Sequence, residues 1–193
     1  MNELIERLRS KFNTRDIHKN KTGHVFLTVE KKDVEGCVLY LKEFEGYGHL
    51  TFISAVDWIE KDMFELVYHL HNFADRTDVS IKTFIGRKEP SMVSINNLWA
   101  GAKVYEREIR EMFGIDFLGC PRVEEPFALE GWKGMPPMRK EFDTKKYSEE
   151  TYFPRPGRYT KDNVAHMEEK MYSVEAEVKK GIAKTVRKNK SGE

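Results

Sequence analysis

Two histidines spaced two residues apart, His69 and His71, are the first candidates for metal chemistry in this chain. They fall in a run rich in aromatic and branched residues, which predicts a strand, and residues i and i+2 of a strand point to the same face. Imidazoles placed in this way bind zinc when further ligands complete the set. No third ligand follows nearby in the sequence, so we predict no metal site here.

Paired carboxylates and thiols are the other groups whose chemistry must be considered. Glu106 and Glu108 stand at i and i+2 of a predicted helix and point to different faces, so they cannot serve one substrate as acid and base. Cys37, beside Val38 on another predicted helix, is expected to be a small core residue, and Cys120 to be structural. The chain contains no Gly-x-Gly-x-x-Gly, Walker or Cys-x-x-Cys sequence. We therefore predict no catalytic residue and no cofactor.

The run from Tyr105 to Phe117 is the most informative stretch, because it combines six charges of both signs with large apolar groups. On a helix, its apolar residues form a single stripe. These residues are Tyr105, Ile109, Met112 and Phe113. Gly114 can adopt the left-handed conformation that ends a helix. The pattern predicts an amphipathic helix that ends at this glycine.

The charged flank of this helix has two possible uses. Glu106 with Arg110, and Arg107 with Glu111, are pairs of opposite sign one turn apart, which support a helix. Arg107, Arg110 and the later Arg139 each offer the planar guanidinium fork that makes interface pairs specific. The flank could form a salt-bridge lattice within the chain, or it could contact a partner.

The segment behind the helix, residues 119–142, is rich in proline and aromatic residues with interleaved charge and has no periodicity. Trp132 and Phe142 bracket the pair Pro136 and Pro137, and aromatic residues with arginine dominate protein interfaces. The same tryptophan could instead cover the core of its own domain. We expect a partner interface that includes Glu106, Arg107, Glu108, Arg110, Trp132, Pro136, Arg139 and Phe142.

These residues carry a family resemblance. The run Tyr-Glu-Arg-Glu-x-x-x-Met-Phe-Gly-Ile-x-Phe, then Gly-x-Pro and Trp-x-Gly-x-Pro-Pro-x-Arg-Lys-x-Phe, resembles the 30 kDa-type (NuoC-like) subunit of respiratory complex I. Related subunits occur in archaeal membrane-bound hydrogenases and ferredoxin-oxidising complexes. The resemblance covers roughly residues 20–142 and includes Phe64 to Leu70 and Trp99 to Ala102. It departs from the complex I pattern at Cys120 to Pro126, which favours the hydrogenase-like or ferredoxin-dependent relatives.

The resemblance implies a non-catalytic, cofactor-free subunit in the peripheral arm of a membrane-bound redox complex. It also implies a place beside the large subunit related to [NiFe]-hydrogenases, on the cytoplasmic side of the cell membrane. The same role in a quinone-reducing complex I is the alternative. A free-standing adaptor or small enzyme of the same fold is an alternative of another class.

Bulk composition agrees with a packed, intracellular domain without membrane spans. Of the 193 residues, 39% are hydrophobic and 34% are charged, and the net charge is +1. A charge so near zero argues against nucleic acid as a partner. No run of about 18 apolar residues is present, so we expect no direct membrane insertion. Two distant cysteines fit a reducing compartment.

The periodicity predicts an α+β fold, a mostly antiparallel sheet with helices on one face. The predicted elements are a helix over 2–12, a strand over 24–29, a helix from an Asp33 cap to Gly46, strands near 49–58, 63–72 and 79–85, and two short helices after Pro90. Together they make one domain over residues 1–142.

Residues 143–193 differ in composition and are expected to form an extended C-terminal arm with a helix near 162–180. The first part holds no aliphatic residue, and the helical part has only a narrow seam of methionine and valine. Such a segment cannot build its own core, so it is either a solvated arm or a partner-binding arm. The partner contacts would involve Tyr152, Phe153, Met167, Met171 and Val174.

Overall fold

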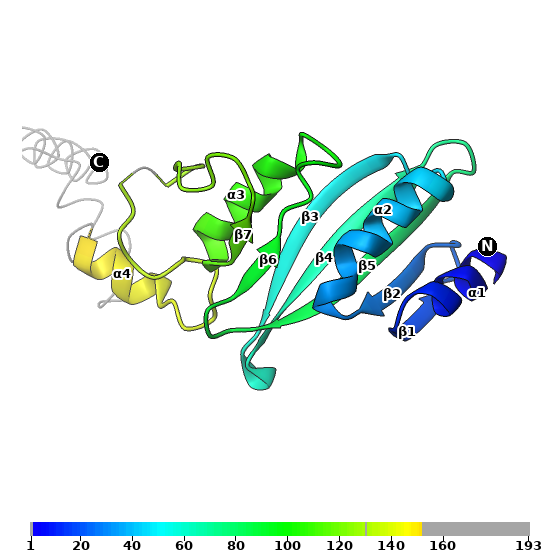
Figure 1. The fold of residues 1–193 in the computed structure, drawn as a ribbon. Helices are drawn as coiled ribbons and strands as arrows, with labels where there is room; N and C mark the ends of the chain where they lie inside the picture. Colours follow the sequence, from blue (N-terminus) through cyan, green and yellow to red (C-terminus); the bar gives the residue numbers. More distant parts are fainter. Residues whose placement is uncertain (1, 130, 152–193) are drawn as a thin grey trace, which may run out of the picture. The chain divides into compact units, whose positions relative to one another are not determined.

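The computed structural model describes residues 2–129 and 131–151, and the chain divides into two units, Met1–Phe142 and Asp143–Glu193. The first unit is an α+β domain, drawn in Figure 1. Its elements are α1 (Asn2–Lys11), β1 (Thr14–Lys19), β2 (Val25–Val29), the 3-10 turn η1 (Lys31–Asp33), α2 (Val34–Phe44), β3 (His49–Trp58), the 3-10 turn η2 (Ile59–Lys61), β4 (Met63–Asn72), β5 (Thr77–Gly86), β6 (Ser91–Val93), α3 (Ala102–Phe113) and β7 (Asp116–Leu118).

Five strands form one sheet in the order β1-β2-β5-β4-β3. The pairs β1–β2, β5–β4 and β4–β3 are antiparallel, and β2–β5 is parallel. The three long strands were predicted from their branched and aromatic residues and are confirmed. β1 was not predicted, because Thr14 to Lys19 is mostly polar and largely exposed.

One face of the sheet carries the core. Along β4, alternate residues Phe64, Leu66, Tyr68 and Leu70 are fully buried. They pack in one cluster with Leu4 and Leu8 of α1 and with the apolar side of α2. The predicted placement of helices on one face of a mostly antiparallel sheet is confirmed (Figure 1). The opposite face of the sheet is left without these helices.

Helix α2 departs from the prediction at its ends. Asp33 precedes the helix, but its side chain makes no capping hydrogen bond, because the 3-10 turn η1 already leads the backbone into the helix. At the other end Gly46 adopts a φ of +77°, as expected for the residue that stops a helix. Phe44 lies on the outer side and is exposed, whereas Cys37 is buried in the core, as predicted.

A second, two-stranded sheet pairs β6 with β7 in parallel. Two short helices were predicted after Pro90, and the first of them is wrong: Ser91–Val93 is a strand, followed by turns that lead to α3. The pairing explains the error. β7 follows α3 in the sequence, and local periodicity does not indicate that a strand pairs with a segment so much later in the chain.

In the second unit the structure describes α4 (Thr144–Thr151). The carboxylate of Asp143 accepts hydrogen bonds from the backbone amides of Lys145 and Lys146, each at 3.0 Å, which is an N-cap. The predicted helix near 162–180 and the predicted contact residues Tyr152, Phe153, Met167, Met171 and Val174 lie outside the described residues.

Candidate partner-docking surface

Helix α3 is the amphipathic helix that the sequence predicts. Ile109 and Phe113 are buried, and the Phe113 ring meets the Phe64 ring of β4 edge-on at 6.1 Å between centroids. The hydroxyl of Tyr105 donates to the carbonyl of Thr51 in β3 at 2.9 Å. The apolar stripe therefore fixes α3 against the sheet beside β3.

Glu106 requires a correction, because it was expected on a partner interface and its side chain is fully buried. Its carboxylate accepts hydrogen bonds from the Ser94 hydroxyl at 2.6 Å and from the backbone amide of Ile95 at 2.9 Å. Glu106 thus ties α3 to the turn after β6 and is unavailable to a partner.

The flank of α3 that holds Arg107 and Glu111 binds the chain's own loop. The Arg107 guanidinium donates to the carbonyls of Glu125 and Pro126 at 3.2 and 2.8 Å. The Glu111 carboxylate accepts from three consecutive backbone amides at 2.8 to 3.1 Å, those of Phe127, Ala128 and Leu129. Burial raises the pKa of Glu111, but the three amides outweigh it, so the pKa of this carboxyl lies below its usual range. This flank of α3 therefore forms a lattice of contacts within the chain.

Two further arginines also act within the domain. Arg110 pairs with the Glu124 carboxylate and lies 3.5 Å from that of Asp116. Arg139 donates from Nε to the carbonyl of Phe113 at 2.7 Å, at the carboxyl end of α3 where acceptors are left over. The expected pairs one turn apart on α3 are thus replaced by contacts to residues distant in sequence.

Close packing holds the proline-rich segment against the end of α3. Gly114 has a φ of +72°, and a Cβ there would lie 3.0 Å from Pro136 Cγ and 3.1 Å from Arg139 Nη2. Only glycine satisfies both the conformation and the space. The Trp132 and Phe142 rings lie 5.6 Å apart between centroids, so the two aromatic residues that bracket the prolines meet each other.

Apolar side chains remain exposed on this tightly held segment. Met138 is 56% exposed, Met135 48% and Phe127 41%. A groove of about 340 Å³ lies between β3 and α3. Its lining residues are Ile53, Ser54, Ala55, Glu108, Ile109, Met112, Phe113 and Met138. Of the predicted interface residues, Glu108 is exposed and lines this groove. We name the exposed Phe127, Met135 and Met138 together with this groove the docking surface.

The candidate chemical groups are the histidines of β4 and the thiol of Cys120. His69 and His71 share one strand face, as predicted, and the described part of the chain holds no cluster of three or more metal-ligating side chains that could bind an ion. Burial, and then the Glu106 carboxylate, raise the pKa of the Cys120 thiol to about 12, so the thiol stays protonated near neutral pH.

Comparison with known proteins decides the family. The model of the family described as "Respiratory-chain NADH dehydrogenase, 30 Kd subunit" matches residues 27–148, which is more than half of the chain. The chain belongs to this family. The sequence motifs on α3 and in the loop behind it had indicated the same family.

Relatives of the 30 kDa family that resemble this chain are parts of oxidoreductase complexes. The C subunit of NADH-quinone oxidoreductase from Roseiflexus castenholzii is 38% identical over 96 residues, which cover 49% of this chain and 55% of that protein. The chain therefore spans about half the length of this relative. The C/D subunit of NADH-quinone oxidoreductase from Phocaeicola vulgatus is 31% identical over 107 residues, 55% of this chain and 20% of that protein.

A solved member of an archaeal complex has the same fold. The chain is similar to one chain in the structure of the membrane-bound sulfane sulfur reductase, an archaeal respiratory membrane complex, with a TM-score of 0.72 and 26% identity. The match covers 78% of this chain and 90% of that chain. The likeness extends over nearly all of that archaeal chain and most of this one.

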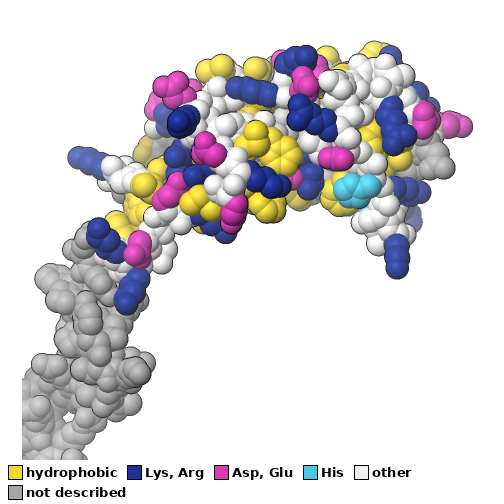
Figure 2. All heavy atoms as spheres, turned by 90° about the horizontal axis from the view of Figure 1, so that it is seen from below, with side chains coloured by type: hydrophobic (Ala, Val, Ile, Leu, Met, Phe, Trp, Pro, Cys, Tyr) yellow, Lys and Arg dark blue, Asp and Glu magenta, His cyan; other side chains and the backbone are white. Residues whose placement is uncertain are grey.

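Two surface properties bear on the partners of this 30 kDa-type subunit. Lys and Arg side chains alternate with Asp and Glu on the face drawn in Figure 2, and apolar side chains reach the surface between them. That face therefore carries no field of a single sign. Within residues 2–129 and 131–151, no helix combines the length and the apolar character needed to cross a bilayer.

Proposed function

We propose that this protein is a non-catalytic subunit of the peripheral arm of a membrane-bound redox complex, on the cytoplasmic side. It would hold the large subunit related to [NiFe]-hydrogenases through the docking surface on α3 and the loop behind it. The proposal rests on one observation: the loop is held by many internal polar contacts, yet it keeps Phe127, Met135 and Met138 exposed. A scaffold that fixes apolar groups at the surface is preorganised for binding.

The internal lattice strengthens this proposal because it sets the shape of the loop before a partner arrives. Glu111 and Arg107 hold residues 125–129 from one side, and Arg139 holds the loop's other end to α3. Ordering costs of about 0.5–1.5 kcal/mol per side chain are therefore partly met in the free protein. Partner contact through Trp132, Pro136 and Phe142 belongs to the same proposal.

The name of one relative supports a larger neighbouring subunit as the partner. In Phocaeicola vulgatus the matching region is 20% of a polypeptide named as the C/D subunit, so a C-type region is covalently joined there to the region of another subunit. Joining two chains is favourable when they already lie together in the complex.

The protein would catalyse no reaction itself, and neighbouring subunits would transfer the electrons and protons. The purified chain should show no visible absorption from flavin or iron–sulfur groups and no stoichiometric zinc. One equivalent of tightly bound metal, lost on changing His69 and His71 to alanine, would contradict this part of the proposal.

The parent complex has two candidates. The structural likeness to a chain of the sulfane sulfur reductase favours a hydrogenase-like or ferredoxin-dependent complex, and the names of the curated relatives favour a quinone-reducing one. A neighbouring gene for a large subunit with both cysteine pairs intact would indicate hydrogenase chemistry, and loss of a pair would indicate another acceptor.

Co-purification tests the docking surface directly. The large subunit is tagged and co-expressed with the wild-type chain or with the variant Met135→Lys/Met138→Lys, which places two charges on the docking surface. We expect the wild-type chain to co-purify with the large subunit and the recovered amount of the variant to be at least tenfold lower. The matched control is Phe44→Lys, an exposed apolar residue at the end of α2. Loss with the control, or full recovery with the variant, would contradict the proposal.

The arm, residues 143–193, is proposed to contact a neighbouring subunit as well. Deleting it should leave residues 1–142 folded, with an unchanged unfolding midpoint, while the complex is recovered in lower yield. Unfolding of the truncated chain would show that the arm is part of the domain and would overturn this role.

A further inference from the structure

The sheet face without helices carries a row of rings in contact, of which three pairs are stacked and one, His24 with His69, is edge-on. From β1 to β3 the rings of neighbouring residues approach each other in turn, at 4.0 to 5.0 Å between centroids. The row consists of His18, Phe26, His24, His69 and Phe52. Three of the five side chains in the row are imidazoles.

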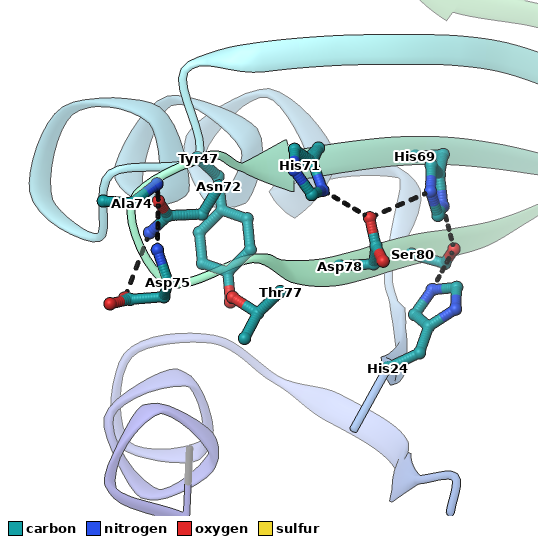
Figure 3. A network of polar contacts seen from close by, with 10 residues as sticks. All are labelled: His24, Tyr47, His69, His71, Asn72, Ala74, Asp75, Thr77, Asp78 and Ser80. Atoms are coloured by element: carbon teal, nitrogen blue, oxygen red, sulfur yellow. Dashed lines mark hydrogen bonds and ion pairs between the residues drawn. The ribbon is translucent and has the colours of Figure 1, made fainter. Parts of the chain in front are cut away.

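Ser80, in the middle of the sheet, joins two of these imidazoles (Figure 3). Its Oγ lies 3.0 Å from Nε2 of His24 and 2.9 Å from Nδ1 of His69, and the side chain is almost fully buried. Because His24 precedes β2, Ser80 is in β5 and His69 is in β4, the contacts connect three strands.

The other nitrogen of His69 faces a carboxylate. Nε2 of His69 lies 3.5 Å from Oδ1 of Asp78, and Nδ1 of His71 lies 2.8 Å from the same oxygen. An ionised carboxylate only accepts hydrogen bonds, so Nδ1 of His71 donates to Asp78. Nε2 of His69 is at ion-pair distance from the same carboxylate, which attracts an N–H and repels a nitrogen lone pair. Neutral His69 therefore favours its hydrogen on Nε2 and keeps Nδ1 as an acceptor.

The direction of every remaining contact follows from that assignment. Ser80 has one hydrogen, and it must go to Nδ1 of His69. Ser80 Oγ then accepts from His24, whose Nε2 carries its hydrogen. The chain runs from His24 to Ser80, from Ser80 to His69 and from His69 to Asp78, with each neutral imidazole in the Nε2–H form. This arrangement of donors and acceptors exists only while Nδ1 of His69 carries no proton.

We propose that His24, Ser80 and His69 form a proton-binding site that joins β2 to β4 across β5 while empty and weakens that junction when it takes up protons. A proton on Nδ1 of His69 turns this acceptor into a donor and displaces the Ser80 hydrogen. A proton on His24 places a cation beside His69. Each protonation forms one N–H bond with a proton from solvent, and no bond between heavy atoms is formed or broken.

The surroundings favour the neutral state at neutral pH. Burial is the main cause that lowers the pKa of His24, and His69 and His18 add to it. Burial likewise lowers the pKa of His69, with a smaller contribution from His71, while Asp78 acts against both shifts. The carboxylate of Asp78 therefore does not offset the cost of charging two partly buried imidazoles.

Lys82 of β5 is a further charged group beside the row. It pairs with Glu65 of β4 at 2.8 Å, and its Nζ lies 5.8 Å from the centroid of the Phe26 ring. His49, at the start of β3, lies against Phe73 with 5.2 Å between ring centroids. His49 is opposite His71 in the register of β3 with β4, so it is on the same face but outside the hydrogen-bonded chain, and it serves as a control.

The sign of the pH effect on stability follows from the lowered pKa values of His24 and His69. An unfolded histidine has a pKa near 6.5, above that of folded His24 or His69, so the unfolded chain binds more protons. The contribution to stability is complete above about pH 6.5 and declines as the pH falls below it.

NMR titration of the full-length protein tests the assignment without any substitution. At pH 7.5 both His24 and His69 should be in the Nε2–H form, and on acidification both should titrate below the pKa of about 6.5 of an unfolded histidine. Titration of either residue at or above that value, or an Nδ1–H form of His69, would overturn the proposal.

Urea unfolding at pH 7.5 and 5.5 supplies a second, independent test. In His24→Gln/His69→Gln the amides can keep hydrogen bonds but take up no proton, so the proton uptake on unfolding should fall by up to about two per molecule. His49→Gln is the matched substitution outside the hydrogen-bonded chain and should leave the contacts of Ser80 in place. An unchanged pH dependence in the double variant would refute a proton-binding site.

Discussion

The buried carboxylate of Glu106 accepts a 2.6 Å hydrogen bond from the hydroxyl of Ser94, twelve residues earlier in the chain. The contact explains why the charge-rich run 105–117 belongs to a helix that is fixed to the domain rather than to a loose surface helix. It also joins α3 to β6, the strand that pairs with β7 beyond the helix.

Replacing Glu106 by glutamine should destabilise the domain. The amide group offers one acceptor oxygen where the carboxylate serves both Ser94 and the amide of Ile95, so one buried polar group loses its partner. We expect a loss of about 1–3 kcal/mol in the free energy of unfolding, measured by urea denaturation. Glu108→Gln on the exposed side of the same helix should change it by less than about 0.5 kcal/mol. Equal effects of both substitutions would disagree with the buried position of Glu106.

The apolar and charged sides of α3 should differ in what they stabilise. Phe113→Ala removes a buried ring that packs on Phe64, and we expect a loss of roughly 3–5 kcal/mol in the isolated chain. Arg110→Ala removes exposed ion pairs and should cost less than about 1 kcal/mol. If Arg110→Ala destabilises the chain as severely as Phe113→Ala, the ion pairs of Arg110 hold α3 as strongly as the buried ring does, which would contradict this division.

Gly114 should not tolerate a side chain. Alanine there would combine a left-handed backbone with contacts near 3.0 Å to Pro136 and Arg139, so we expect a lower thermal midpoint and a loss exceeding about 1 kcal/mol. Gly101, at the other end of α3, has a φ of −72° and open space around it. Gly101→Ala is therefore the control and should be neutral. A neutral Gly114→Ala would show that the proline segment is not held against α3.

The loop behind α3 should loosen in acid. The pKa of Glu111 is lowered in the folded state, so the unfolded chain binds more protons and stability is complete above the ordinary glutamate pKa of about 4.3. It declines as the pH falls below that value, because protonation weakens the hydrogen bonds from Phe127, Ala128 and Leu129. Native-state hydrogen exchange, compared between Glu111→Gln and wild type at pH 6, should show faster exchange of these three amides. Unchanged exchange would mean that the carboxylate does not hold the loop.

The sequence predicted the elements whose periodicity is local. β3 and β4 have the predicted bounds, and the stripe of α3 and its stop at Gly114 were also predicted. It could not predict β1, whose residues are largely exposed, or β6, whose partner lies beyond a helix. The burial of Glu106 was missed for the same reason, since a charged residue can be recognised as internal only when Ser94 and Ile95 are known to meet it. The exposed methionines of the docking surface carried no pattern of their own.

Hydrogen exchange of the chain alone and within its purified complex tests the central claim most directly. If the docking surface holds the large subunit, amides in residues 131–138 should exchange at least tenfold more slowly in the complex. The core helix α2 should exchange equally slowly in both and serves as the reference. Equal exchange of residues 131–138 in the two states, with slowing confined to the sheet face that carries His24 and His69, would contradict the assignment of the docking surface.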